Sequence, residues 1–142
     1  MGKIMTKLKV TNNTDFENSR QGLIRPDQLR SVEIDALVDT GATMLALPEE
    51  VVAAAGLPVH GHRNIKDALG RISEVPWVRG VLIEILGREM TCDALVIPRG
   101  ATPLIGQIPL EGLDLVVDPK TQEVRVNPAS PDVPLMDLMR VA

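Results

Sequence analysis

The segment ALVDTGAT, residues 36–43, places a single carboxylate, Asp39, at the end of an apolar run and follows it with a hydroxyl and a glycine. Burying an isolated carboxylate is costly unless it is hydrogen-bonded or shares a proton with a second acid. Two carboxyl groups that share one proton divide the roles of acid and base, so they can activate water and protonate a leaving amine. Thr40 can donate a hydrogen bond, and Gly41 lets the backbone turn tightly beside a bound chain. The segment therefore predicts peptide hydrolysis by a pair of acids.

The second acid of such a pair has no source within the chain. No other Asp-Thr-Gly or Asp-Ser-Gly occurs, since Asp93 is followed by Ala94 and Asp118 by Pro119. A two-fold axis beside Asp39 would bring two identical carboxylates face to face. The single motif therefore predicts a homodimer with one shared active site. The alternative interpretation of the motif is a strand-ending acid that caps the next turn.

Composition excludes several other classes of protein. A chain of 142 residues with 44% hydrophobic and 24% charged residues suits one globular domain. The net charge of −4 and the scarcity of aromatic residues, only Phe16 and Trp77, argue against nucleic-acid binding. The single cysteine, Cys92, excludes an internal disulfide and is expected to be a small buried hydrophobe. The polar residues 1–10 and the lack of a membrane-spanning run make a cytoplasmic protein without membrane contact the default expectation.

The elements that must position Asp39 are mostly strands. Apolar alternation predicts a strand over residues 5–12, with Leu8 and Val10 on one face, and another over 30–39. The segment between them, residues 14–29, is expected to be a long surface loop that can reach the active-site rim. Residues 47–58 predict the main helix, because a proline and two glutamates occupy its first turn and Gly56 ends it.

The second half of the chain indicates three hairpins. The first has its tip at Asp67–Gly70, the second joins its strands at Gly87–Arg88, and the last turns at Asp118–Thr121. A short helical turn is expected at 109–112. Residues 128–142 form a Pro-rich tail, a linker or docking segment, which we separate from a domain spanning residues 1–127. Many short strands with few helices predict an all-β, closed or sandwiched fold.

These features together resemble the retropepsin-type, retroviral-like aspartic proteases, a half-size family that works as a dimer. ALVDTGAT is similar to the apolar–apolar–Asp–Thr–Gly–Ala core of that family. Residues 81–106 resemble its paired strands, which lead to an apolar–apolar–Gly motif, here Leu104-Ile105-Gly106, followed by a short helix. The resemblance spans roughly residues 30–117, and the order of the motifs makes it specific.

The resemblance implies an all-β, closed acid-protease barrel with one main helix and a flap hairpin over an extended peptide substrate. Asp39 would be the catalytic acid, Thr40 would join a hydrogen-bonded grip across the two-fold axis, and Gly41 would offer its carbonyl to the substrate. No metal or organic cofactor is implied. The other residues expected to bind substrate lie after the motif, on the flap tip and in the second motif: Thr43, Ala46, Ala68, Leu69, Gly70 and Leu104.

Two positions depart from the family pattern. Thr43 and Gln107 stand where the family often has an Asp–Arg ion pair, and a neutral hydrogen bond between them is expected to replace it. The pair His60 and His62 lacks the accompanying Cys or carboxylate ligands of a metal site, so a solvated loop at the base of the flap is favoured. Two alternatives remain open: a non-catalytic peptide-binding or dimerisation module on the same fold, and a regulatory β-domain that does not dimerise.

Overall fold

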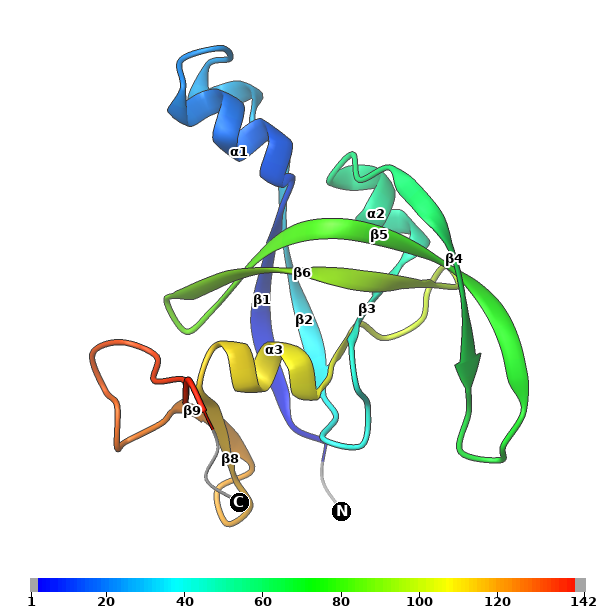
Figure 1. Ribbon diagram of the computed structural model, residues 1–142, viewed down its shortest axis with the longest axis vertical. Coiled ribbons are helices and arrows are strands. Elements are labelled where there is room, and N and C mark those ends of the chain that lie inside the picture. Colours follow the sequence, from blue (N-terminus) through cyan, green and yellow to red (C-terminus); the bar gives the residue numbers. More distant parts are fainter. Residues whose placement is uncertain (1–2, 140–142) are drawn as a thin grey trace.

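The computed structural model describes residues 3–139 as a β-rich fold with a few short helices (Figure 1). This confirms the predicted predominance of strands. The helical segments are α1 (Asn13–Arg20), the 3₁₀ turn η1 (Pro26–Gln28), α2 (Glu49–Ala54) and α3 (Gln107–Gly112). The strands are β1 (Met5–Thr11), β2 (Ser31–Val38), β3 (Leu45–Pro48), β4 (Val59–Lys66), β5 (Ile72–Ile85), β6 (Arg88–Ile97), β7 (Leu104–Ile105), β8 (Leu115–Asp118) and β9 (Glu123–Val126).

Seven of the described strands form one sheet in the order β1-β2-β7-β3-β6-β5-β4. Strand β1 also pairs with β5, so the hydrogen-bonded pairings lead from β1 around to β1 again, while β4 lies outside this ring. The hydrophobic core lies against the apolar face of each strand. On β1 this face carries Leu8 and Val10, both fully buried as the alternation predicts. The other fully buried strand residues include Leu45, Leu47, Val78, Val81, Ile83, Ala94 and Ile105.

The predicted hairpins are present with small shifts. The β8–β9 pair has the expected register, in which Leu115 faces Val126 and Val117 faces Val124. The β5–β6 turn lies at Leu86 and Gly87, one residue earlier than predicted. Both turn residues have positive φ, 52° and 81°, which matches the tight turns that suit the twist of a hairpin.

The prediction of a long loop over residues 14–29 is wrong, because the segment contains α1 and η1. Asn12 begins α1 by accepting a hydrogen bond from the backbone N–H of Asp15, at 3.0 Å. The Asn12 side chain also donates to the carbonyls of Ala55 and Gly56, which ties the helix start to the end of α2. The segment lies at the opposite end of β1 and β2 from Asp39 (Figure 1). The expectation that it can reach the rim of the site around Asp39 is therefore wrong.

The helix predicted over residues 47–58 is confirmed as α2, but it is not the main helix. It has six residues, Glu49–Ala54, whereas the unpredicted α1 has eight. Its inner side buries Val51 and Val52 against the sheet. None of the helices within residues 3–139 is long and apolar enough to cross a membrane.

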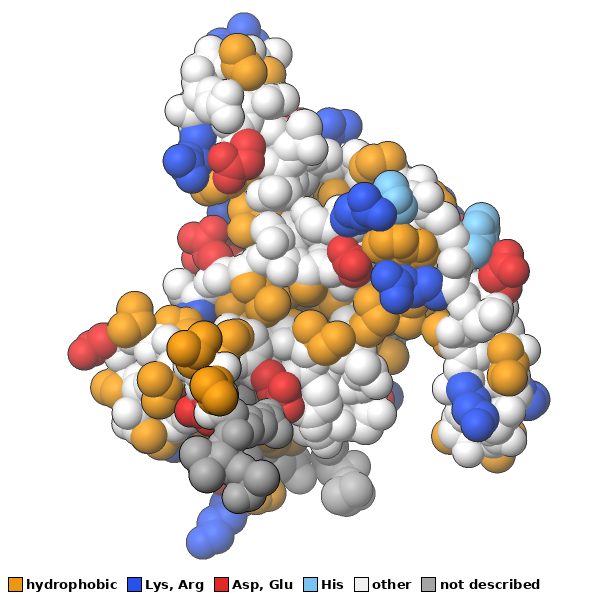
Figure 2. Space-filling model, viewed as in Figure 1, with side chains coloured by type: hydrophobic (Ala, Val, Ile, Leu, Met, Phe, Trp, Pro, Cys, Tyr) orange, Lys and Arg blue, Asp and Glu red, His pale blue; other side chains and the backbone are white. Residues whose placement is uncertain are grey.

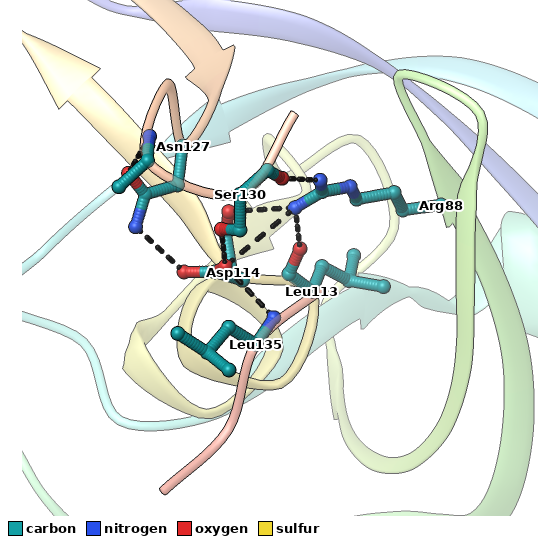
Figure 3. Close-up of polar contacts among 7 residues, drawn as sticks. Arg88, Leu113, Asp114, Asn127, Ser130 and Leu135 are labelled. Atoms are coloured by element: carbon teal, nitrogen blue, oxygen red, sulfur yellow. Dashed lines mark hydrogen bonds and ion pairs between the residues drawn. The ribbon is translucent and has the colours of Figure 1, made fainter. Parts of the chain in front are cut away.

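The Pro-rich tail is described only as far as Met139, and its residues 140–142, like residues 1–2, lie outside the described part. No helix forms between Val133 and Met139. The tail is attached through Asp114, whose carboxylate accepts hydrogen bonds from the Ser130 hydroxyl and from the Leu135 backbone N–H (Figure 3). The buried Arg88 guanidinium completes the attachment by donating to the Ser130 carbonyl.

Candidate active site

Asp39 begins a short connection between β2 and β3, which we call the Asp39 loop (residues 39–44). Strand β2 pairs in parallel with β7, so Leu37 lies beside Leu104 and Val38 beside Ile105. The Asp39 backbone N–H donates to the carbonyl of Ile105, at 3.0 Å. The two sequence motifs that are far apart along the chain therefore meet at the start of the Asp39 loop.

The first turn of α3 supports the Asp39 loop through backbone hydrogen bonds. The backbone N–H groups of Gln107 and Ile108 donate to the carbonyls of Ala42 and Thr43, each at 2.9 Å. The first N–H groups of a helix have no partner inside the helix, so the loop carbonyls satisfy them. Gly106 permits this close approach, because a Cβ there would lie only 2.6 Å from the Met44 carbonyl oxygen.

Gln107 adds a side-chain contact to the same loop. Its amide nitrogen donates to the carbonyl of Thr40, at 2.9 Å. The expectation that Gln107 would replace an ion pair by bonding to Thr43 is therefore wrong, because the amide reaches past Thr43 to the turn itself. The carbonyls of Thr40, Ala42 and Thr43 all accept hydrogen bonds from α3, which gives the loop one defined shape.

The Asp39 carboxylate lies at the surface of a cavity and not in the core. It is half-buried, and it accepts a hydrogen bond from the backbone N–H of Gly41 at 2.9 Å. A Cβ on Gly41 would lie 3.2 Å from the same carboxylate oxygen, so the turn is tight. In the single chain Asp39 is therefore accessible to solvent. Its carboxylate does not carry the desolvation cost of a fully buried acid.

An open cavity of about 580 Å³ lies next to Asp39. Six of the residues predicted to form the site line it together: Asp39, Gly41, Thr43, Ala46, Ala68 and Leu104. Three others do not. Thr40 contributes its carbonyl to Gln107, and Leu69 and Gly70 lie at the hairpin tip beyond the lining, with Leu69 78% exposed.

Sequence reasoning assigned no binding role to the rest of the cavity wall, although it placed Asp67 at the tip of the predicted hairpin as a turn residue. These residues are Ala42, Met44, Ile65, Lys66, Asp67, Leu95 and Ile97. Leu95 and Ile97 alternate along β6 and so share one face, a signal that was available. Which of the two faces of β6 borders the cavity depends on the parallel pairing of β3 with β6, and this pairing is not visible in the local pattern.

The tip of the β4–β5 hairpin is organised by Asp67. Its carboxylate accepts hydrogen bonds from the backbone N–H groups of Leu69 and Arg71, at 2.9 and 3.0 Å, and from the Arg71 guanidinium at 2.9 Å. These contacts, first the backbone N–H of Arg71, lower the pKa of Asp67. Because Ile65, Lys66, Asp67 and Ala68 line the cavity, the hairpin forms one of its walls.

Other reactive side chains of the described residues lie elsewhere. No group of three His, Cys, Asp or Glu side chains within residues 3–139 is arranged to hold a metal ion. His60 and His62 are exposed, but they belong to strand β4 and not to a loop. Burial raises the pKa of the Cys92 thiol to about 12, so this side chain does not supply a thiolate nucleophile near neutral pH.

Comparison with known proteins agrees with this geometry. Residues 28–112 match the model of the family described as "gag-polyprotein putative aspartyl protease". The match covers more than half of the chain and includes the Asp39 loop, the β4–β5 hairpin and β7 with the start of α3. No curated protein matches the chain.

Proposed function

Because the chain belongs to the retroviral-like, gag-polyprotein aspartyl protease family, we propose that it is an endopeptidase whose catalytic dyad is formed by Asp39 from two subunits of a homodimer. The observation that carries the proposal is the cavity that joins the Asp39 carboxylate, the Leu104 side chain and the β4–β5 hairpin. The substrate class that fits is an extended peptide, and the chemistry needs no metal or organic cofactor.

The need for a second copy follows from the acids that line the cavity. Asp67 is the other carboxylate there, but it is engaged by Arg71 and by two backbone N–H groups. These donors favour its charged form, so Asp67 is unsuited to share a proton. Asp39 has a local hydrogen bond from Gly41 and is otherwise open at the surface. A symmetry-related Asp39 is therefore the best partner for it.

In the proposed reaction one Asp39 is protonated and its twin is ionised. The ionised carboxylate takes a proton from a water molecule as the water oxygen attacks the carbonyl carbon of the peptide. The protonated carboxyl group donates its proton to the carbonyl oxygen, which gives a neutral tetrahedral diol. The carboxyl group that took the water proton then donates it to the amide nitrogen, the other carboxylate takes a proton from a diol hydroxyl, and the C–N bond breaks, which restores the starting dyad.

The remaining residues have supporting roles in the proposal. Gly41 accepts a backbone hydrogen bond from the substrate, and Thr40 contacts its counterpart across the two-fold axis. Thr43, Ala46 and Leu104 line small, largely apolar subsites. The β4–β5 hairpin acts as a flap, and Ala68, Leu69 and Gly70 reach the peptide when it closes. The ring of pairings among β1, β2, β7, β3, β6 and β5 supports a closed barrel, which we assign to a domain spanning residues 1–127 and followed by the tail of residues 128–142.

The variant Asp39→Asn tests the proposal. It keeps the shape of the side chain but removes the ionisable group, so we expect cleavage of a peptide library to be abolished and thermal stability to be unchanged. The matched control is Asp35→Asn, on strand β2 just before the Asp39 loop, whose exposed carboxylate pairs with Lys7. Cleavage by Asp39→Asn at the wild-type rate would reject the dyad.

The homodimer is tested separately by mixing. Asp39→Asn subunits added in excess to wild-type subunits would form dimers with one carboxylate, so activity should fall below that of the wild-type protein alone. Sedimentation at micromolar concentration should give the mass of two chains. Full activity in a species of one chain would contradict the shared site. A dimer that binds peptides without cleaving any would instead be a non-catalytic peptide-binding module.

A further inference from the structure

The base of the β4–β5 hairpin carries a cationic surface built on the only tryptophan of the chain. The Trp77 ring has the guanidinium carbon of Arg63 4.3 Å from its centre and that of Arg79 5.4 Å from it. The His60 ring contacts Trp77 edge-on, at 5.0 Å between centroids. In Figure 2 basic side chains, a histidine and an acidic side chain gather around apolar surface on the side where β4, β5 and β6 meet. We call Trp77, Arg63, Arg79 and His60 the Trp77 cluster.

Local backbone features place the ring and its cations. Gly61 lies opposite Trp77 in the β4–β5 register, and a Cβ on Gly61 would lie 3.1 Å from the indole nitrogen. The ring therefore lies across a position that has no side chain. Trp77 precedes a bulge between Val78 and Val81 of β5, and Arg79 lies within it beside Gly80, whose N–H donates to the Asp93 carboxylate at 3.1 Å.

The Trp77 cluster carries excess positive charge. Asp93 lies 3.8 Å from the Arg63 guanidinium, a long and partly exposed ion pair. Arg79 is exposed and forms no ion pair within the described residues. Cation–π contact with Trp77 restrains both guanidinium groups without using up their N–H donors. Since the whole chain has a net charge of −4, this cluster is a local exception to an acidic protein.

The Trp77 cluster adjoins the Asp39 cavity. Arg63 and Ile65 are two residues apart on β4, so they lie on one face, and Ile65 lines the cavity. Asp93 and Leu95 have the same relation on β6. Arg63 and Asp93 line a neighbouring pocket of about 420 Å³, and Met44 lines both the pocket and the cavity. An extended peptide leaving the cavity along this face would meet Arg63 about 7 Å, or two residues, beyond Ile65.

From this continuity of Arg63 with the cavity, and from the contact of Arg79 with the same Trp77 ring, we propose that Arg63 and Arg79 bind acidic side chains of the substrate, outward from the peptide bond at Asp39. The proposal rests on the proposed endopeptidase function and adds a substrate class, peptides with Asp or Glu two or more residues from the cleaved bond. A guanidinium presents a planar fork of donors that matches a carboxylate. A single-stranded nucleic acid fits less well, because stacking needs a free aromatic face and guanidinium groups already lie against Trp77.

Binding can be measured without catalysis, because Trp77 is the only tryptophan and its fluorescence reports directly on the cluster. The probe is capped hexaglutamate, compared with capped hexaglutamine, in low-salt buffer with the Asp39→Asn variant. We expect a saturable change in emission with hexaglutamate alone, which weakens as salt is added. Replacing Arg63 or Arg79 by Gln should weaken binding about fivefold each, the size expected for an exposed charge pair. The matched control is Arg25→Gln, at an exposed position before η1, which should leave the binding of hexaglutamate unchanged.

Cleavage provides the second measurement. In a random peptide library, wild-type products should be enriched in Asp and Glu two or more residues from the cleaved bond, and the double variant Arg63→Gln/Arg79→Gln should lose this enrichment. For an acidic peptide the double variant should raise KM and leave kcat unchanged.

The outcomes separate the two proposals. If no peptide is cleaved, the proposed function fails, and the fluorescence titration still decides the acidic-peptide surface. Equal responses to hexaglutamate and hexaglutamine, or unaltered binding by the double variant, would overturn the inference. A stronger response to a single-stranded oligonucleotide than to hexaglutamate would also overturn it.

Discussion

The side-chain amide of Gln107 donates a hydrogen bond to the main-chain carbonyl of Thr40, with 2.9 Å between nitrogen and oxygen. It joins the first residue of α3 to the residue that follows Asp39. Two backbone hydrogen bonds from α3 support the same loop at Ala42 and Thr43. The position of the Asp39 carboxylate therefore depends on a helix that begins 68 residues later in the sequence, as the numbering of Asp39 and Gln107 gives.

Gln107→Leu should lower the rate of peptide cleavage, because it removes the donor that holds the turn at Thr40. The contact is exposed, so the free energy of unfolding should fall by only about 1 kcal/mol. The measurements are kcat and urea unfolding. Gln107→Arg keeps an N–H donor at this position and should retain more activity than Gln107→Leu. Equal rates for the wild-type protein and Gln107→Leu would contradict this role.

Gly106→Ala should destabilise the fold by about 1 to 3 kcal/mol, a typical cost of inserting an atom into a packed region. The added Cβ would lie 2.6 Å from the Met44 carbonyl oxygen and 2.7 Å from that of Ala42, and backbone atoms cannot move aside cheaply. The φ of Gly106 is −92°, so the effect is one of space and not of backbone strain. Urea unfolding measures the change, and a variant as stable as the wild-type protein would show that α3 and the Asp39 loop can separate.

Asp67→Ala should raise KM for peptide substrates several-fold and leave the thermal midpoint almost unchanged. The carboxylate organises only the exposed tip of the β4–β5 hairpin, through Leu69 and Arg71, so the core is not involved. A disordered tip would have to be ordered again when the peptide binds. Glu74→Gln, an exposed change on the same hairpin, is the control. An unaltered KM would mean that the shape of the tip does not matter for binding.

The free energy of unfolding should fall as the pH is lowered, because hydrogen bonds in the folded protein lower the pKa of Asp114 to about 2. The Ser130 hydroxyl contributes most, followed by the Asn127 amide and the Leu135 N–H (Figure 3). In the unfolded chain the carboxyl group titrates at its ordinary value of 3.8. Its contribution to stability is therefore complete above about pH 4 and is lost as the pH falls from about 4 to about 2.

The test compares the wild-type protein with Asp114→Asn by urea unfolding between pH 2 and pH 7. The variant should be less stable at pH 7, and the difference between the two proteins should narrow as the pH falls below 4. Taking the difference removes the contributions of Asp15, Asp67 and Asp118, whose pKa values are also lowered and which titrate equally in both proteins. A constant difference across this range would show that the Asp114 charge does not stabilise the fold.

Local patterns in the sequence were sufficient for the features that depend on near neighbours. The alternation of Leu8 and Val10 identified β1 and its buried face, and the turn residues located the hairpins. The Asp39 motif was recognisable because its chemistry needs those residue types in that order. In contrast, α1 contains one apolar residue, Phe16, so it shows no helical periodicity. Its start is stabilised by contacts of Asn12 with Ala55 and Gly56, which no local pattern records.

The sequence alone thus determined the family, the strand-rich class and the identity of Asp39, because each is encoded in short runs of residue types and their spacing. The tertiary structure alone decided which side chains surround that carboxylate. The Thr40–Gln107 contact and the cavity wall from Ile65 to Leu95 join strands and helices that are distant in the chain, and the Trp77 cluster depends on the register of the β4–β5 hairpin. Such contacts depend on sheet register and on the faces that strands present after folding, and many sequences with the same local patterns would place different residues there.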